Sequence, residues 1–199
     1  MKLLDDKFNI NLYKKLVKEF GDDYRSLNWG SKSSQEKRFK VLNKIGIENH
    51  NTVLDFGCGI GDFLDWSNKH NLKLNYTGID ITPGMIKLAK SKFPEQNFIC
   101  QNIFEQGLST RYDFILASGV FTYMNYEFFK KCIDILFKNA KIGVGFNLLN
   151  KREIKEDSTN IEFSMEPLET IEFCMNYTNK LIIDLSYHKN DFTIFMYKQ

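Results

Sequence analysis

A short apolar run that leads into three alternating glycines, residues 53–63 (VLDFGCGIGDF), constrains the fold more than any other feature of the sequence. A buried strand that ends in glycines lets the backbone turn sharply and leaves no Cβ between the main chain and a ligand. Asp80 follows Gly61 by nineteen residues, and an acid at the end of the next strand can accept hydrogen bonds from both hydroxyls of a ribose. The pattern predicts a site for a nucleotide-like cofactor.

The spacing of the glycines distinguishes between cofactors. In the dinucleotide fingerprint G-x-G-x-x-G, the third glycine lets the following helix pack on the strand and place its N-terminus on a pyrophosphate. Here Asp62 holds that position, while Gly57, Gly59 and Gly61 run G-x-G-x-G, and Asp55 precedes them within the strand. This arrangement favours an adenosine that carries a cationic sulfonium and an amino acid. An NAD site, or a plain glycine-rich turn between a strand and a helix, is the alternative.

Residues 53–61 resemble the first motif of the class I S-adenosylmethionine (SAM) methyltransferases, and Asp80 matches the ribose-binding acid of that family. Cys58 within the turn and Ile81 beside the acid fall at cofactor-binding positions of the same motifs. The resemblance implies SAM as the cofactor and S-adenosylhomocysteine (SAH) as its product. It also implies a Rossmann-like α/β fold, in which a mostly parallel seven-stranded sheet has an antiparallel last strand and helices on both faces.

Two further segments match cofactor-binding positions of this family. Asn102 and Ile103 follow the third expected strand, where the family commonly places an acid or amide at the adenine amino group and an apolar neighbour against the ring. The usual acid is replaced by Asn102, whose carbonyl oxygen can still accept a hydrogen bond; a polar strand cap is the alternative interpretation. Residues 117–121, which include Ser118, resemble the fourth motif, where cofactor and acceptor meet.

An amino-terminal segment, residues 29–39 (WGSKSSQEKRF), is similar to a W-G-S-x-x-S-Q-x-x-R-F segment in a small bacterial subgroup of these enzymes, and residues 191–197 match the last strand of that subgroup. Gln35 and Arg38 lie three residues apart, so a helix places them on one face, where they could hold the methionyl carboxylate. A solvated helix face is the alternative. Trp29 is expected either to close over the site or to cap the core.

Short apolar runs alternate with helical stretches in a way that agrees with a mostly parallel sheet. The expected strands cover residues 52–56, 76–79, 97–101, 112–117 and 141–146, and the expected helices cover 9–20, 33–45, 62–69, 85–92 and 125–139. Ser33 or Ser34 is the candidate cap of the second helix. A helix over residues 166–177 precedes a hairpin of two strands, 180–186 and 192–197.

The length of 199 residues suits one domain. We expect residues 1–50 to form a helical cap and residues 51–199 to form the Rossmann-like core. The stretch 104–111 is too short and too glycine-broken for a full crossover helix, so that side of the sheet is expected to be thinly covered.

Charge and apolar runs argue against several classes of protein. A net charge of +2, from 27 basic and 25 acidic residues, gives no strong field, so a nucleic-acid partner is not indicated. The first six residues are too acidic for a signal peptide, and nowhere do about 18 uncharged residues run together, so we expect no membrane insertion and a cytoplasmic location. The cysteines form no C-x-x-C motif, which predicts neither a metal site nor a disulfide; Cys100, Cys132 and Cys174 are interpreted as small core residues.

Methyl transfer from a sulfonium is an in-line displacement, which requires alignment and exclusion of water more than covalent catalysis. If the acceptor is a hydroxyl, His188 in the last hairpin is the candidate base, with an exposed turn histidine as the alternative. Phe121 and Tyr123, after the fourth strand, can shape the acceptor pocket or pack in the core.

The charged segment 147–167 is the expected lid. Within it, Lys151 and Arg152 can pair with a phosphate or carboxylate of the acceptor, or simply remain solvated.

The sequence therefore predicts a SAM-dependent methyltransferase with a small-molecule acceptor, through O-methylation of a sugar, a phosphate-linked group or a carboxylate. The subgroup resemblance suggests bacterial surface-polysaccharide or secondary metabolism. No N-P-P-Y run follows the fourth strand, which weighs against methylation of nucleic-acid bases. Because no unmistakable base is present, a catalytically silent SAM-binding or partner subunit is the alternative. The oligomeric state is left open.

Overall fold

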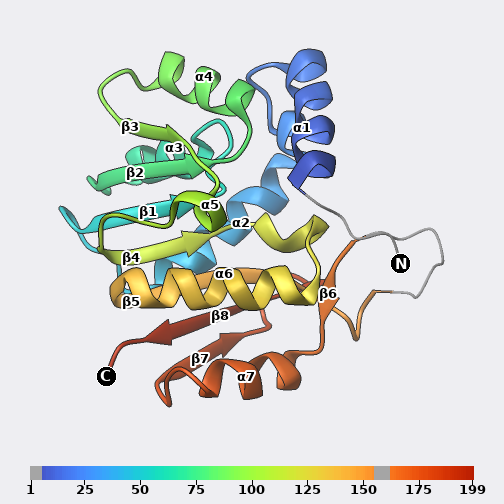
Figure 1. Cartoon of the computed structure of the whole chain (residues 1–199), viewed down its shortest axis with the longest axis vertical. Coiled ribbons are helices and arrows are strands. Elements are labelled where there is room, and N and C mark those ends of the chain that lie inside the picture. Colours follow the sequence, from blue (N-terminus) through green and yellow to red (C-terminus); the bar gives the residue numbers. More distant parts are fainter. Residues whose placement is uncertain (1–5, 155–161) are drawn as a thin grey trace.

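The computed structural model describes residues 6–154 and 162–199. Within these ranges eight strands form one sheet: β1 (Thr52–Phe56), β2 (Asn75–Asp80), β3 (Asn97–Cys100), β4 (Tyr112–Ala117), β5 (Ala140–Asn150), β6 (Ser164–Met165), β7 (Leu181–Asp184) and β8 (Asp191–Tyr197). Their order is β3-β2-β1-β4-β5-β8-β7, and the short β6 pairs with β5 (Figure 1). The strands β1 to β5 pair in parallel, and β8 runs antiparallel to both β5 and β7. The α/β fold with an antiparallel last strand is confirmed.

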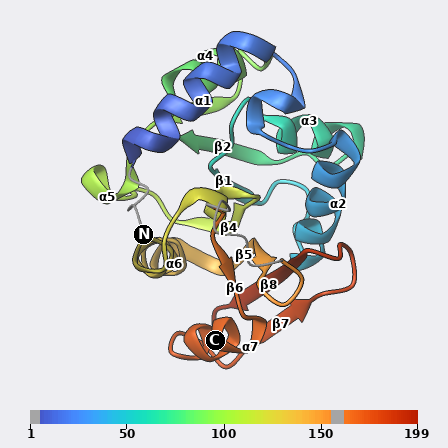
Figure 2. The same cartoon turned by 90° about the vertical axis from the view of Figure 1, so that its right-hand side faces the viewer.

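Seven α-helices accompany the sheet in the described residues: α1 (Asp6–Phe20), α2 (Lys32–Leu42), α3 (Asp62–Lys69), α4 (Pro83–Lys92), α5 (Ile103–Gln106), α6 (Tyr126–Asn139) and α7 (Pro167–Met175). Single 3₁₀ turns cover Tyr24–Leu27, Asn43–Ile45 and Val120–Tyr123. We call residues 6–50, which carry α1 and α2, the cap. In Figures 1 and 2 α1 lies beside α4, beyond the ends toward which the arrowheads of β1 and β4 point.

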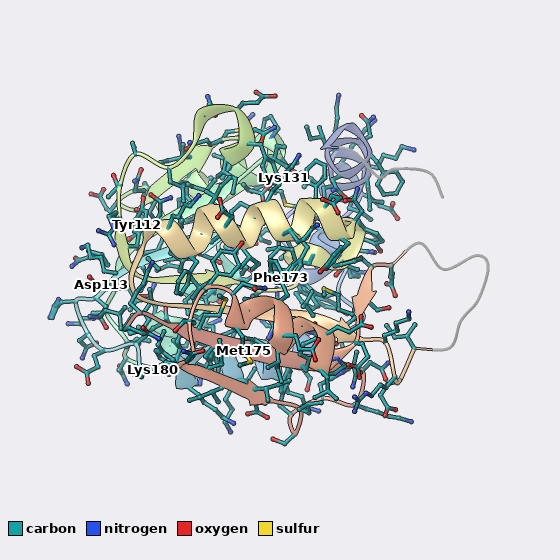
Figure 3. All side chains as sticks on the ribbon, turned by 60° about the horizontal axis from the view of Figure 1, so that its bottom comes forward. Tyr112, Asp113, Lys131, Phe173, Met175 and Lys180 are labelled. Atoms are coloured by element: carbon teal, nitrogen blue, oxygen red, sulfur yellow. The ribbon has the colours of Figure 1, made fainter. Side chains whose placement is uncertain are left out.

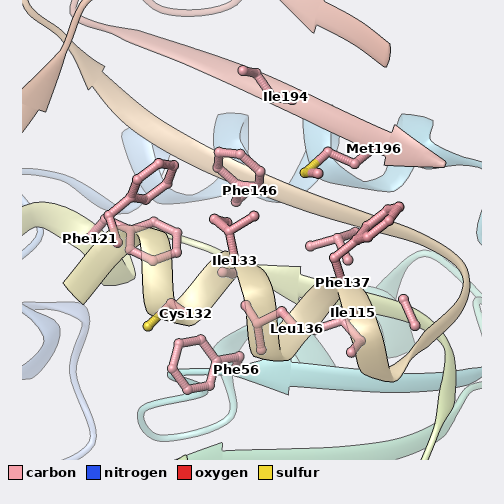
Figure 4. Packing of buried hydrophobic residues seen from close by; sticks show 14 of the residues in the cluster. Phe56, Ile115, Phe121, Cys132, Ile133, Leu136, Phe137, Phe146, Ile194 and Met196 are labelled. Carbon is pink, nitrogen blue, oxygen red and sulfur yellow. The ribbon is translucent and has the colours of Figure 1, made fainter. Parts of the chain in front are cut away.

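The sheet has an apolar cluster on each face, because successive strand residues point to opposite sides. On β1, Val53 packs with the helices α2, α3 and α4, whereas Leu54 packs in the cluster that contains α6. Figure 4 shows α6 placing Ile133 and Leu136 toward the sheet. Both faces are therefore covered, as a parallel sheet requires.

Phe129 of α6 is the centre of an aromatic group on the α6 face. It is fully buried, and its ring contacts the rings of Phe121 and Phe146 at centroid distances of 5.1 and 5.7 Å. Phe173, which lies between α7 and α6 in Figure 3, adds a contact at 5.6 Å. Rings at these separations add to the hydrophobic contribution of burial. This group joins β5, α6 and α7 into one unit.

Two details of the cap and the sheet edge differ from the sequence prediction. Ser31, and not Ser33 or Ser34, is the N-cap of α2, since its Oγ accepts a hydrogen bond from the Ser34 N–H at 3.1 Å. Cys100 is exposed, in contrast to the predicted core position, because it ends β3, the strand at one edge of the sheet.

The strand β5 continues four residues beyond the predicted end and takes up the start of the expected lid. Its extension is paired with β8, where Asn147 lies opposite Thr193. The Asn147 side chain finds a buried partner there, donating from Nδ2 to Thr193 Oγ1 at 2.6 Å. A polar residue thus fits a central strand because its neighbour satisfies it. Residues 155–161 of the expected lid lie outside the described residues.

The stretch 104–111 contains no full crossover helix, as predicted, and only the short helix α5 lies at its start. It spans only Ile103–Gln106 and ends at Gly107, whose φ of +66° terminates it. Its length agrees with the expected thin cover on that side of the sheet.

Replacing Phe129 by Ala should lower the free energy of unfolding by about 3–5 kcal/mol, because a fully buried ring leaves a cavity among other rings. Leu168→Ala on α7, where the side chain is 59% exposed, is the matched control and should cost less than about 1 kcal/mol. Urea unfolding followed by circular dichroism measures both. Equal losses in the two variants would contradict the central role of Phe129.

Candidate functional site

A cavity opens at the carboxyl ends of β1, β2 and β4, beneath the cap. Its lining combines residues of the cap, of the strand ends and of the loops that follow them. Ten of the residues predicted from the sequence line it: Trp29, Gln35, Asp55, Gly57, Cys58, Asp80, Ile81, Asn102, Ile103 and Ser118. These come from five separate stretches of the chain. The fold therefore brings most of the predicted cofactor positions together.

The glycine turn has the backbone shape that its sequence predicts. Gly57, Gly59 and Gly61 all have positive φ, at +71°, +54° and +84°, a region that side chains disfavour. The N–H groups of Gly57 and Cys58 both donate to the carbonyl of Ile79, at 2.8 and 3.0 Å. These bonds fix the turn to the end of β2. Gly59 and Gly61 shape the turn without lining the cavity.

Asp80 is held by backbone amides on both of its oxygens. Oδ2 accepts from the Gly59 N–H at 3.0 Å, and Oδ1 accepts from the Thr82 N–H at 2.7 Å. Burial raises the pKa of Asp80, and the bonds from Thr82 and Gly59 oppose that rise. A carboxylate has about four acceptor positions, so each oxygen can accept a further hydrogen bond. The side chain can thus receive two hydroxyl donors from a diol.

Asp55 is buried within β1, with 3% of its surface exposed, and accepts a hydrogen bond from the Tyr76 hydroxyl at 2.7 Å. Burial raises the pKa of Asp55 to about 7, although the bond from Tyr76 acts in the opposite direction. Asp62 and Asp80 also line the cavity, whereas its described lining includes no Lys, Arg or His. The electrostatic character of the cavity suits a cation.

The cap contributes residues that the sequence analysis did not assign. Asn9 and Tyr13 of α1, together with Leu27, line the cavity. Gln35 Nε2 donates to Asp62 Oδ2 at 2.9 Å, so the cap is bonded to the first residue of α3. Asp62 occupies the position of the third glycine in the dinucleotide fingerprint. This difference from the fingerprint was the one sign in the sequence that Asp62 takes part in the site. The α1 residues carry no motif and depend on how the cap folds back.

The lining residue Asn102 has a local structural partner. Its Oδ1 accepts a hydrogen bond from the Phe104 N–H at 3.0 Å, which makes it the N-cap of α5. The Asn102 oxygen that is expected to accept from an adenine amine therefore also caps the N-terminus of α5. Its second lone pair is the one available to a ligand.

Arg38 does not line the cavity, although Gln35 does. The Arg38 side chain forms an ion pair with Asp191 of β8, donates from Nη1 to the Ser34 carbonyl at 3.1 Å, and lies 4.6 Å above the Trp29 ring. Asp191 is 1% exposed, and the guanidinium offsets part of the cost of burying its charge. The structure therefore does not bring Arg38 to the predicted cofactor position.

The predicted base His188 also lies outside the cavity lining. Its Nε2 is 3.4 Å from Ser34 Oγ, and its Nδ1 is 3.7 Å from Asp191 Oδ1. Burial lowers the pKa of His188, and the charge of Asp191 opposes this effect. The ring thus contacts polar groups of α2 and β8 and does not line the cavity.

Four predicted acceptor residues occupy other environments. Phe121 is buried against Phe129, and Tyr123 accepts a hydrogen bond from Asn28, so neither lines the cavity. Lys151 is exposed, and Arg152 pairs with Glu166 at the start of α7. Of the predicted acceptor set, only Trp29 lines the cavity.

Replacing Asp55 by Asn should make the protein more stable at neutral pH. The pKa of Asp55 is about 7 in the folded protein, against an ordinary value of 3.8 in the unfolded chain. The contribution of Asp55 to stability is therefore full below pH 3.8, where both states bind the proton, and it is lost as the pH rises to 7. The amide removes that loss, of the order of 4 kcal/mol, and can still accept from the Tyr76 hydroxyl. Urea unfolding at about pH 4 and about pH 8 measures the effect.

Asp113→Asn is the control of opposite sign, because hydrogen bonds from Thr52 and the charge of Lys141 lower the pKa of Asp113 below its usual value despite partial burial. That variant should lose stability above the unfolded pKa. A loss of stability for Asp55→Asn near pH 8 would show that Asp55 is ionised and well compensated in the folded protein.

Comparisons with known proteins find methyltransferases that are similar to this chain. Residues 54–142 match the family model described as "Methyltransferase domain". A protein of Mycobacterium tuberculosis named as a methyltransferase is 25% identical over 158 residues, which are 74% of this chain and 93% of that protein. The malonyl-[acyl-carrier protein] O-methyltransferase of Priestia megaterium is 29% identical over 55% of this chain and 42% of its own length. The trans-aconitate 2-methyltransferase of Escherichia coli is also 29% identical, over 53% of this chain and 42% of its length.

Solved structures share the fold along most of the chain. Magnesium protoporphyrin IX methyltransferase from Synechocystis, with bound SAM, has a TM-score of 0.71 at 16% identity, over 98% of this chain and 94% of that one. The plantazolicin methyltransferase, in complex with SAH and a substrate analogue, has a TM-score of 0.67 at 17% identity, over 98% and 92%.

None of the described helices combines the length and the apolar composition that crossing a bilayer requires. The likeness of residues 29–39 to one bacterial subgroup stays a prediction. The findings support an enzyme that uses SAM, as the glycine turn and Asp80 predict. Residues 54–142 are similar to a methyltransferase domain, and the chain shares the fold of the solved methyltransferases.

Proposed function

We propose that this protein transfers the methyl group of SAM to a carboxylate oxygen of a small acceptor and so forms a methyl ester. The observation that carries the proposal is the composition of the cavity. Its described lining has three carboxylates, Asp55, Asp62 and Asp80, and contains no histidine, lysine or arginine. Such a cavity suits a cationic cofactor, and it offers no evident base for deprotonating a hydroxyl.

The residues present fit SAM. Ser118 Oγ and Asn9 Oδ1 are buried and have no hydrogen-bond partner within the described residues, so the lining has polar capacity left for a ligand. When bound, SAM supplies a methyl group on a positively charged sulfur. Asp80 would hold the ribose hydroxyls, and the carboxylates of Asp55 and Asp62 would offset the positive charges of the sulfonium and ammonium groups. The cap side chains Leu27 and Trp29 would exclude water.

A carboxylate acceptor requires little more from the protein than position. It is ionised at neutral pH, so its oxygen can form the new C–O bond while the C–S bond breaks and the electron pair goes to sulfur. Its charge and that of the sulfonium cancel during transfer, which a poorly hydrated cavity favours. A sugar hydroxyl would need a base, and the candidate His188 lies elsewhere. Two relatives, named for malonyl and trans-aconitate substrates, act on acids, which supports the same class.

The cofactor half of the proposal is tested by calorimetric titration with SAM, SAH and NAD. We expect SAM and SAH to bind and Asp80→Ala to weaken both by about tenfold to a hundredfold, because hydrogen bonds to a charged group are lost. Asp65→Ala is the matched control, because this acid of α3 pairs with Lys69 and does not line the cavity. Binding of NAD alone, or of no ligand, would refute the cofactor assignment.

The acceptor half is tested with SAM labelled in its methyl group. The protein is incubated with a panel of small carboxylates, including malonyl thioesters and trans-aconitate, and with a matched panel of sugars and sugar phosphates. A methyl ester releases labelled methanol in mild base, whereas a methyl ether does not. We expect base-labile label on carboxylates. Base-stable label on sugars would favour O-methylation of hydroxyls, and no transfer to any acceptor would favour a silent SAM-binding subunit.

A further inference from the structure

Arg38 is buried but does not reach the cavity, so its function requires another explanation. Its side chain is 8% exposed and forms an ion pair with Asp191, whose side chain is 1% exposed. Nη1 also donates to the carbonyl and hydroxyl oxygens of Ser34. The guanidinium is therefore fixed by partners on two elements. A planar group fixed in this way can act as a platform for an aromatic ring.

Trp29 occupies the other side of that platform. The Arg38 guanidinium carbon lies 4.6 Å from the centroid of the Trp29 ring. The same ring packs on the backbone of Gly119, where a Cβ would lie 2.5 Å from the ring atom Cη2. Gly119 has a φ of +68° and follows Ser118 at the end of β4. The indole is thus held between Arg38 and a glycine of the cavity lining.

The sheet order assigns Trp29 to the acceptor side of the cavity. Asp80, the candidate ribose ligand, ends β2, and the glycine turn ends the next strand, β1. If Asn102 after β3 holds the adenine and Asp80 after β2 holds the ribose, the rest of the cofactor would lie toward β1 and β4, where Ser118 and Gly119 line the cavity. An acceptor must approach that end. Trp29 therefore lines the part of the cavity that an acceptor would occupy.

We propose that Arg38 is a positioning residue: fixed by Asp191, it holds Trp29 against Gly119 and thereby sets the shape of the acceptor side of the cavity. This inference rests on the proposed function and adds to it a determinant of acceptor binding. Direct binding of an acceptor carboxylate by Arg38 does not fit, because the guanidinium is occupied by Asp191 and Ser34.

A purely structural role, joining the cap to the last hairpin, is the competing explanation. The chain offers a matched control for it. Lys44, just after α2, pairs with Asp184 of β7 at 2.8 Å, and its side chain is 55% exposed. This second ion pair also links the cap to the hairpin, but it has no contact with Trp29. A variant at Lys44 therefore separates attachment of the cap from placement of the indole.

The first experiment uses Trp29 as its own reporter. The sequence contains two tryptophans, so Trp66→Phe leaves Trp29 as the only indole. In that background Arg38→Lys keeps a charge for Asp191 but loses the planar platform. We expect the Trp29 emission to shift to longer wavelength and acrylamide quenching to increase, while Lys44→Ala leaves both unchanged. Trp29 emission unchanged in Arg38→Lys would overturn the proposal, whatever the effect on thermal stability.

The second experiment measures kinetics with the acceptor identified by the labelling assay. Arg38→Lys should raise the acceptor KM by about fivefold to tenfold, with a smaller change in kcat and little change in SAH affinity. Trp29→Phe, which leaves the ion pair intact, should raise KM similarly, and adding Arg38→Lys to it should cause little further change. Additive effects, or an unchanged KM, would refute positioning through Trp29.

The two proposals fail in different ways. If no acceptor is methylated, the proposed reaction is wrong, and the fluorescence of Trp29 in Arg38→Lys still decides whether Arg38 holds the indole. If methylation is found and the emission is unchanged, only the role of Arg38 is wrong.

Discussion

The bonds between the Asp80 carboxylate and two backbone amides are the constraint on which the rest of the site depends. Through Gly59 and Thr82 the carboxylate connects the turn after β1 with the turn before α4. The turn after β1 in turn sets where α3 begins, and therefore where Asp62 meets the cap through Gln35. One half-buried acid thus connects the ends of two strands with the starts of two helices.

Burial of acids is costly to the folded state, and the cavity concentrates that cost. Asp55 and Asp80 both have raised pKa values because burial disfavours their charged forms. Backbone amides and the Tyr76 hydroxyl offset part of this cost without supplying a positive charge. A cationic ligand would supply a positive charge, so the cost of burying these acids and the proposed binding of a sulfonium have the same electrostatic origin.

The parts of the site that could be predicted from sequence are those fixed by local chemistry. The glycines had to adopt positive φ where a strand turns into a helix, and Asp80 had to end the next strand, so spacing along the chain was sufficient. Arg38 shows why the rest was missed. The direction of the Arg38 side chain depends on Asp191, a buried acid at the other end of the sequence. Helical spacing alone predicted that Arg38 would share the cofactor-facing side of the helix with Gln35. Asn147 was misassigned to a lid for the same reason, since its partner Thr193 is remote.

The contact between Arg38 and Asp191 has a consequence for the order of assembly. The cap is synthesised first, but its buried guanidinium acquires a counter-charge only when β8 has been made and inserted between β5 and β7. The buried ion pair therefore cannot form until almost the whole chain has been made. The contact that supports Trp29, and with it one wall of the cavity, thus depends on a strand from the opposite end of the sequence.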